Sequence, residues 1–274
     1  MMDIQRVCAI YFSPTGGTAK VADTIAAELA DRLGVAAEQQ SFTRPREREN
    51  TYVFGGRDLV VVAFPTYAGK LPNKILPDLK TKIKGNGALA VPVVTFGNRS
   101  YDHSLAELCA ALEENGFHTV AAGAFVCRHA FTDELGYGRP GWSDQYEMKT
   151  FAGQVAQKVK GLTQVSESIQ VPGDADAPYY IPKGTDGEPA KFLKAKPQTN
   201  LSRCNGCGAC VRGCPMGAID PKNVSNVPGT CIKCQACVRK CTKRAKYFDD
   251  PAFLSHVTML EQNFSDPRDN ETFL

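Results

Sequence analysis

Apolar runs and amphipathic stretches alternate along the first 161 residues of the chain. Short apolar runs bounded by turn residues predict β-strands at 7–12, 58–64, 88–96 and 118–126, and the more polar segment 36–42 is expected as a further strand. Helical spacing of apolar positions predicts helices at 18–33, 72–83, 102–115 and 144–161. Most of these strands are apolar almost throughout, as strands of a parallel sheet are, and helices alternate with them. The pattern therefore predicts an α/β fold with a doubly wound parallel sheet.

Pro92 lies inside one predicted strand, and it donates no ladder hydrogen bond, so it indicates a strand start or a bulge.

The pattern changes after residue 163, where the predicted α/β domain 1–163 ends. Residues 164–200 are rich in Pro, Gly, Asp and Lys and predict a linker, long enough that part of it should pack on something. A cysteine-rich module follows at 201–248. A tail at 249–274 completes the chain, with a helical turn or two predicted at 253–260.

Eight of the eleven cysteines lie between residues 204 and 241, in two copies of one spacing. The first copy is Cys204-x2-Cys207-x2-Cys210-x3-Cys214, followed by Pro215, and the second is Cys231-x2-Cys234-x2-Cys237-x3-Cys241, followed by Thr242. This is the spacing of bacterial [4Fe–4S] ferredoxins, in which the fourth cysteine of each copy ligates the other cluster. We therefore expect two [4Fe–4S] clusters, one held by Cys204, Cys207, Cys210 and Cys241, and the other by Cys231, Cys234, Cys237 and Cys214.

Disulfide bonds and zinc sites fit these cysteines less well than clusters do. Disulfides are unexpected, because the cysteine count is odd and the N-terminus shows no secretory signal. Tetrahedral zinc sites usually have longer gaps between their ligand pairs, and they would leave the doubled spacing without a reason.

Charge divides unevenly along the chain. Residues 191–250 carry 12 Lys and Arg against 3 Asp and Glu, a net of +9, although the whole chain is only +3. A basic stretch can indicate nucleic-acid binding. Here it coincides with ligands of two anionic clusters, whose charge it would compensate, so no nucleic-acid partner is predicted.

A turn of sequence Ser13-Pro14-Thr15-Gly16-Gly17-Thr18 joins the first predicted strand to the first helix. Its backbone N–H groups, the helix N-terminus and its hydroxyl groups suit a phosphate. The loop lacks the lysine of nucleoside-triphosphatases and the G-x-G-x-x-G of dinucleotide-binding folds. A lone phosphate monoester such as that of FMN fits better, and the residues expected to bind it are Ser13, Thr15, Gly16, Gly17 and Thr18.

This loop resembles the Thr/Ser-x-Thr-Gly-Asn-Thr phosphate loop of flavodoxins, with Gly17 in place of the asparagine. The resemblance implies a five-stranded parallel sheet of order 2-1-3-4-5 and two further flavin-binding loops at strand ends. The cofactor-binding residues that it implies there are Pro65, Thr66, Tyr67, Ala68, Gly69, Thr95, Phe96, Gly97, Asn98 and Tyr101. Tyr67 and Tyr101 are the expected ring-stacking residues, and Gly69 the peptide expected at flavin N5.

The chain as a whole resembles flavodoxin–ferredoxin fusion proteins of anaerobic bacteria and archaea. The resemblance implies an electron carrier with one FMN and two [4Fe–4S] clusters, working with redox partner proteins. No catalytic acid–base or nucleophilic constellation is predicted, and Cys8, Cys109 and Cys127 are interpreted as structural thiols. Two alternatives stay open: a flavin-dependent reductase of a quinone, nitro compound or similar acceptor, and a redox sensor with a vestigial flavin site. Without an apolar run of 18 residues or a signal peptide, a cytoplasmic protein is expected, of unknown oligomeric state.

Overall fold

The computed structural model describes residues 3–164 and 167–274. Five parallel strands form the centre of the first domain, in the order β2-β1-β4-β6-β8. Their bounds are β1 Arg6–Tyr11, β2 Ala36–Ser41, β4 Asp58–Pro65, β6 Leu89–Phe96 and β8 Ala122–Val126. This order confirms the predicted 2-1-3-4-5 arrangement, which is the flavodoxin-like form of the doubly wound sheet.

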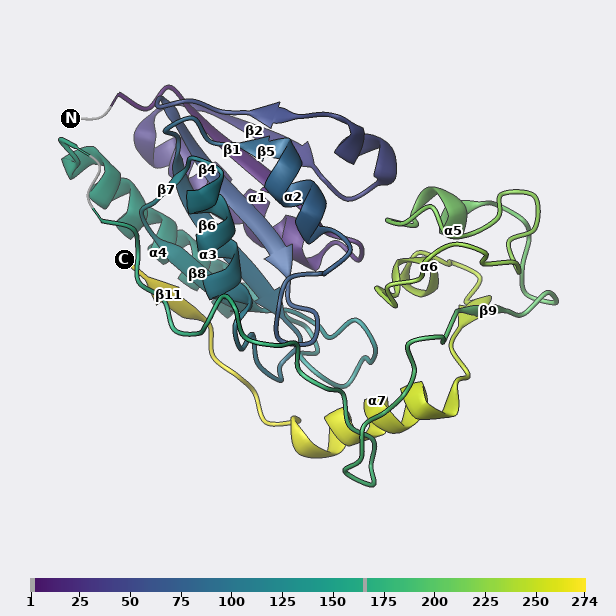
Figure 1. The fold of residues 1–274 in the computed structure, drawn as a ribbon. Helices are drawn as coiled ribbons and strands as arrows, with labels where there is room; N and C mark the ends of the chain where they lie inside the picture. Colours follow the sequence, from purple (N-terminus) through teal and green to yellow (C-terminus); the bar gives the residue numbers. More distant parts are fainter. Residues whose placement is uncertain (1–2, 165–166) are drawn as a thin grey trace.

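Helices cover both faces of this sheet, as Figure 1 shows. Helices α1 (Gly17–Leu33) and α4 (Trp142–Gly161) pack on one face, and α2 (Leu76–Lys82) and α3 (Ser104–Glu114) on the other. Successive strand residues point to opposite faces, so Ala9 belongs to the α1 side and Ile10 to the α3 side. Strands β1, β4, β6 and β8 are therefore buried on both sides, which explains their unbroken apolar runs, whereas the polar edge strand β2 is largely exposed. Short elements complete this sheet domain: η1 Pro45–Glu49, β3 Tyr52–Val53, β5 Ile83–Lys84 and β7 His118–Thr119.

Pro92 coincides with a bulge. The single strand predicted at 118–126 is split into β7 and β8, both of which pair with β6. Ala90 pairs with Thr119 and Val93 with Gly123, so one extra residue stands on the partner strand opposite Pro92. The missing N–H of proline thus falls where the ladder is already interrupted.

The C-terminal tail is more ordered than its sequence indicates. Helix α7 (Pro251–Asn263) is longer than the turn or two predicted, and the Asp250 side chain caps it by accepting from the Phe253 N–H at 2.9 Å. Beyond it, β11 (Glu271–Phe273) adds an antiparallel strand to the edge of the sheet beside β8. The prediction missed β11, because a three-residue polar edge strand has no periodicity to read.

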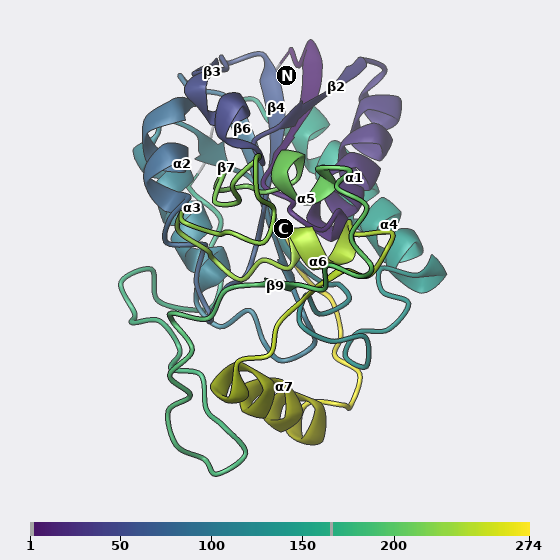
Figure 2. The same ribbon diagram turned by 90° about the vertical axis from the view of Figure 1, so that its right-hand side faces the viewer.

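The cysteine-rich segment forms a small second unit beside the sheet domain, visible around α5 and α6 in Figures 1 and 2. Its regular elements are short: β9 Gln198–Thr199, α5 Ala209–Arg212, α6 Ala236–Arg239 and β10 Lys246–Tyr247. Its apolar core centres on four buried residues, Ala218, Ile219, Val227 and Cys237. So small a core needs a further source of stability, which a bound metal group commonly supplies.

The segment predicted as a linker runs in contact with the sheet domain. The Tyr180 N–H donates to the Ala68 carbonyl at 2.8 Å, and the Tyr179 hydroxyl donates to the Leu71 carbonyl at 2.8 Å. Lys70 donates from Nζ to the Ala177 carbonyl at 2.9 Å, and Arg99 stacks over the Tyr180 ring at 4.2 Å.

None of the described helices is both long and apolar enough to cross a bilayer.

Candidate functional site

The eight motif cysteines divide between two cavities of nearly equal size, about 350 and 340 Å³. We call the four that line one cavity the outer set: Cys204, Cys207, Cys210 and Cys241. The four that line the other are the inner set: Cys214, Cys231, Cys234 and Cys237. Each set takes three cysteines from one copy of the motif and the fourth from the other, which is the grouping predicted from the spacing.

The two sets share a local backbone design. The sulfur of the fourth cysteine accepts a hydrogen bond from the N–H four residues later in both copies: Ala218 to Cys214 at 3.3 Å, and Ala245 to Cys241 at 3.2 Å. Residues before each short helix adopt positive φ, 70° at Gly208 and 61° at Gln235, which turns the backbone around the sulfurs. Among the described residues no three acidic, His or Cys side chains converge tightly enough for a single metal ion; the sulfurs surround cavities instead.

The outer set faces solvent. Cys207 is exposed, and Cys204, Cys210 and Cys241 are partly so. Although burial alone would raise the pKa of Cys241, hydrogen bonds from backbone N–H groups at 243–246 lower it below its ordinary value. The same groups would stabilise a metal-bound thiolate.

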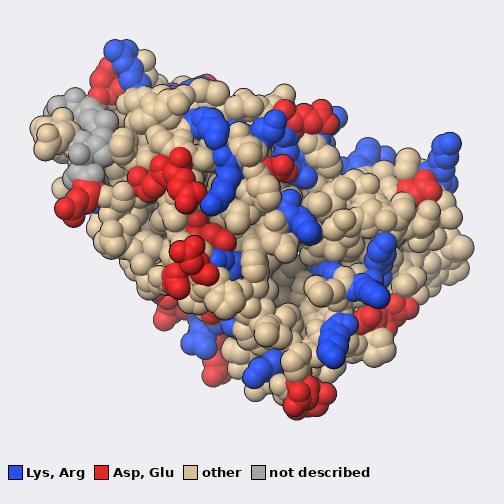
Figure 3. Space-filling model, viewed as in Figure 1, with Lys and Arg blue, Asp and Glu red and all other residues tan. Residues whose placement is uncertain are grey.

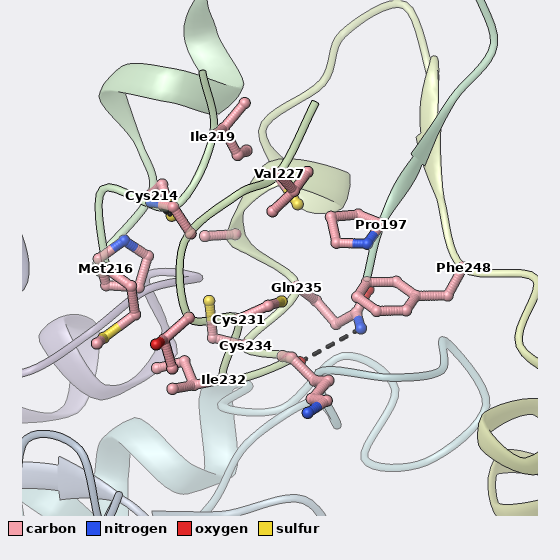
Figure 4. Close-up of a pocket in the computed structure, with 16 residues that line it drawn as sticks. Pro197, Cys214, Met216, Ile219, Val227, Cys231, Ile232, Cys234, Gln235 and Phe248 are labelled. Atoms are coloured by element: carbon pink, nitrogen blue, oxygen red, sulfur yellow. Dashed lines mark hydrogen bonds between the residues drawn. The ribbon is translucent and has the colours of Figure 1, made fainter. Parts of the chain in front are cut away.

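The inner set is more buried than the outer set. Figure 4 shows Cys214, Cys231 and Cys234 around a cavity that Ile219, Val227 and Met216 also line. Cys234 and Cys237 are buried, and burial raises the pKa of the Cys237 thiol to about 12. Thiolates in so apolar a site require a cationic partner, which the irons of a cluster would supply.

The predicted phosphate loop lies at the carboxyl end of β1, where it leads into α1. Gly16 has φ of 98°, and Thr15 and Gly16 are exposed. Of the first N–H groups of α1, that of Ala19 is taken by the Ser13 hydroxyl, while those of Gly17 and Thr18 have no acceptor within the helix. A Cβ on Gly16 would meet nothing within 4 Å. An open loop, free N–H donors and a 17-residue helix dipole fit a phosphate group.

Side chains connect this loop to its neighbours. The Ser13 hydroxyl accepts from the Ala19 N–H at 2.9 Å, and the Thr18 and Thr95 hydroxyls form a buried hydrogen bond of 2.7 Å. Gly17 approaches the Cys127 thiol, where a Cβ would stand 3.3 Å from Sγ. Cys127 is buried, and burial raises the pKa of its thiol to about 12, as expected of a structural thiol.

The loop after β4 turns toward the inner set. Pro65 pairs with Thr95 in the sheet, and Thr66 bonds to Ser104 at 2.6 Å. Ala68 and Gly69 have positive φ and close a tight turn from Tyr67 to Lys70. Burial raises the pKa of the Tyr67 phenol well above its ordinary value, and negative charge on Cys234 and Cys231 adds to the rise. Tyr67, from a predicted flavin loop, is therefore within electrostatic reach of two inner-set cysteines.

The loop after β6 is engaged by the C-terminal tail. Asn98 is buried and donates to the carbonyls of Phe264 and Asp266 at 2.6 and 2.9 Å. Tyr101 is 7% exposed, packs on Phe96 and donates to Glu271 at 2.6 Å. Gly97 lies against His129, so closely that a Cβ would clash with the imidazole ring. Asn98 and Tyr101 thus bond to the tail, whereas Tyr67 lies within electrostatic reach of the cysteine module.

Two arginines that sequence reasoning did not single out connect the domains. Arg239 donates to the carbonyls of His129, Ala130 and Thr132 at 2.9–3.3 Å and forms an ion pair with Asp133. On the other side, Arg48 donates to the Pro215 carbonyl at 2.7 Å.

Met216 and Ile232 pack between these arginines, against the apolar core of the sheet domain. The surface is hollowed where the two units meet (Figure 3). The only sequence signal for Arg239 was its place in the repeated Ala-Cys-Val-Arg.

Comparisons with known proteins match the cysteine-rich module and the sheet domain separately. Residues 203–246 match the family described as 4Fe-4S dicluster domain. A segment of 25 residues, 9% of this chain, is 64% identical to the ferredoxin-type protein NapF of Haemophilus influenzae and spans only 14% of that relative.

Among solved structures, a flavodoxin from the domain Archaea aligns at 16% identity and a TM-score of 0.40, over 57% of this chain and 99% of that one. The flavodoxin of Fusobacterium nucleatum bound to flavin mononucleotide aligns at 14% identity and a TM-score of 0.35, covering 57% and 98%. The flavodoxin-like topology itself rests on the strand order given above.

Proposed function

We propose that this chain, a flavodoxin–ferredoxin fusion with an electron-transfer role, passes single electrons from a cluster in the outer set to one in the inner set, and on to an FMN at the phosphate loop. Clusters exchange one electron at a time, and a bound flavin can store two. The residues proposed to hold the clusters are the two cysteine sets. Those proposed to hold FMN are the three predicted loops, of which the phosphate loop fits best.

One observation carries the proposal: Met216 and Ile232 line the cavity of the inner set and pack against the core of the sheet domain, while the outer set reaches solvent at Cys207. Electrons can therefore enter at the exposed end and leave toward the flavin loops without crossing bulk water. Arg239 and Arg48 hold the two units together on either side of this route. The packed segment 167–197 further supports a fixed arrangement rather than a swinging one.

The chain's own residues would divide the work at the flavin. The loop at 15–18 would bind the phosphate with N–H and hydroxyl donors, and Tyr67 would lie between ring and inner set. Lys70 is buried and paired with Glu107 at 3.2 Å, so it shapes the loop rather than the ligand.

Anaerobic reconstitution followed by rapid kinetics tests the proposal. Protein loaded with iron, sulfide and FMN would be reduced by a photogenerated neutral radical, and the spectra of clusters and flavin followed separately. Cluster reduction should be followed by flavin reduction within one turnover, at a rate independent of protein concentration. Flavin reduction that scales with protein concentration, or failure of the protein to bind FMN, would overturn the route.

A further inference from the structure

Basic side chains predominate on the surface around the outer set. Within 201–248 nine Lys and Arg accompany a single acidic residue, Asp220. Five of these basic side chains are exposed next to outer-set cysteines in sequence or space: Arg203, Arg212, Lys240, Lys243 and Arg244. Figure 3 shows blue side chains outnumbering red ones over this part of the molecule, at right.

Local contacts place these charges around one site. Lys243 lines the outer cavity itself, and Arg203 precedes Cys204. Arg212 folds back to donate to the Cys207 carbonyl at 2.9 Å. Lys240 lies over the end of α5, where a Cβ on Gly213 would stand 2.8 Å from its Cδ. The five charges therefore cluster around the outer set, and we call them the basic rim.

The basic rim is free of internal ion pairs. In the described ranges 3–164 and 167–274, none of its five side chains forms a salt bridge, whereas Arg239, on the domain interface, does. Unpaired like charges on one surface cost stability through mutual repulsion, and they attract anionic partners over about 8 Å at physiological salt.

We infer that the basic rim is the docking surface for an acidic electron-carrier protein, which delivers electrons to the outer cluster or takes them from it. The inference rests on the proposed function and specifies its partner. In the step itself, one electron leaves the partner's reduced centre, which becomes oxidised, and enters the outer cluster, which becomes reduced. No bond forms or breaks and no proton moves. Complementary charge would mainly raise the association rate and fix the orientation.

Charge reversal of the rim tests this inference in the full reconstituted chain. The variant Arg203→Glu/Lys240→Glu/Arg244→Glu leaves all eight cysteines in place, and Lys149→Glu, an exposed position of α4, is the control for a charge reversal away from the outer set. The probe is a reduced acidic [4Fe–4S] ferredoxin, mixed at 50 and 300 mM salt. We expect the second-order rate to fall about tenfold or more with salt, and about 10- to 100-fold in the triple variant at low salt. The control should keep the unaltered rate.

Two further measurements separate the possible failures. A neutral photogenerated radical should reduce the clusters of both variants equally, which shows that the clusters are intact. Rates with the ferredoxin that ignore both salt and charge reversal would overturn the docking surface, even if electrons still reach the flavin. Electrons that stop at the clusters while the salt effect persists would instead overturn the proposed route. Salt-sensitive binding of a DNA oligonucleotide, lost in the triple variant without a change in the ferredoxin rate, would replace the protein partner with nucleic acid.

Discussion

The two cysteine sets have the same sequence rhythm and opposite surroundings. The outer set opens to solvent amid unpaired basic side chains, whereas the inner set is more buried and lines a cavity whose Met216 and Ile232 pack on the sheet domain. The repeat therefore fixes how the cysteines of each set are grouped, while the neighbouring domain decides how exposed each set is. In the proposed route, two copies of one cysteine spacing take the two ends.

The largest expected effect comes from removing a single cluster ligand, tested separately in the inner and in the outer set. Cys234→Ala should leave about half of the iron and sulfide, because the outer set keeps its ligands. Flavin reduction by the remaining cluster should slow by about 100-fold or more, equivalent to about 2.7 kcal/mol of added barrier. Iron and sulfide assays with stopped-flow spectroscopy measure both.

Cys207→Ala is the matched change in the outer set. It should lose a similar amount of iron yet leave flavin reduction by the inner cluster intact when a neutral radical donates the electrons. Equal slowing in the two variants would remove the functional difference between the sets.

The arginines of the repeated Ala-Cys-Val-Arg provide a second contrast. Arg239→Ala removes bonds to three carbonyls and to Asp133, and should lower the free energy of unfolding by about 2–4 kcal/mol. Arg212→Ala removes one exposed bond and should cost less than about 1 kcal/mol. Denaturant titration gives both values, and hydrogen exchange at 128–133 should rise only in the Arg239 variant. Similar costs would mean that Arg239 does not hold the domains together.

The interface should also respond to acid through His129. Burial, and secondarily the nearby His256 and Arg239, lower the pKa of His129 to about 4, against about 6.5 in an unfolded chain. Between these values the unfolded state binds a proton that the folded state does not. Stability should therefore fall by about 1–3 kcal/mol as pH decreases from about 6.5 to 4, and no further from this group below that.

The variant His129→Asn should flatten this slope, since the amide does not titrate, whereas His118→Asn on β7 should not. Denaturant unfolding at pH 7, 5.5 and 4 measures it. An unchanged slope in the His129 variant would assign the acid sensitivity to other groups.

The smallest effect concerns the turn into α5. Gly208 has φ of 70°, and an L-residue in this conformation costs about 1 kcal/mol. Gly208→Ala should lower stability by about that amount without changing cluster content. Gly161→Ala, at the end of α4 with open space around the added Cβ, should be neutral or slightly stabilising. A neutral Gly208 variant would show that this turn is adaptable, as its counterpart Gln235 already suggests by occupying φ of 61°.

The sequence by itself determined the alternation of strands and helices in the sheet domain and the division of eight cysteines into two sets. Both follow from local rules: buried parallel strands are apolar throughout, and a fixed ligand spacing allows one way around a cubane. The strand order came from the resemblance of the phosphate loop to that of flavodoxins, and the structure confirms it. Beyond the two cysteine sets, the sequence could predict the site residues only as members of loops at strand ends.

Only the tertiary structure decided that Tyr67 lies within electrostatic reach of the inner set while Asn98 and Tyr101 bond to the C-terminal tail. Contacts between residues more than 160 positions apart have no local signature, because they depend on which surfaces remain uncovered after each unit has folded. For the same reason β11, Arg239 and the packed course of residues 167–197 could not be read from the pattern of apolar and polar positions.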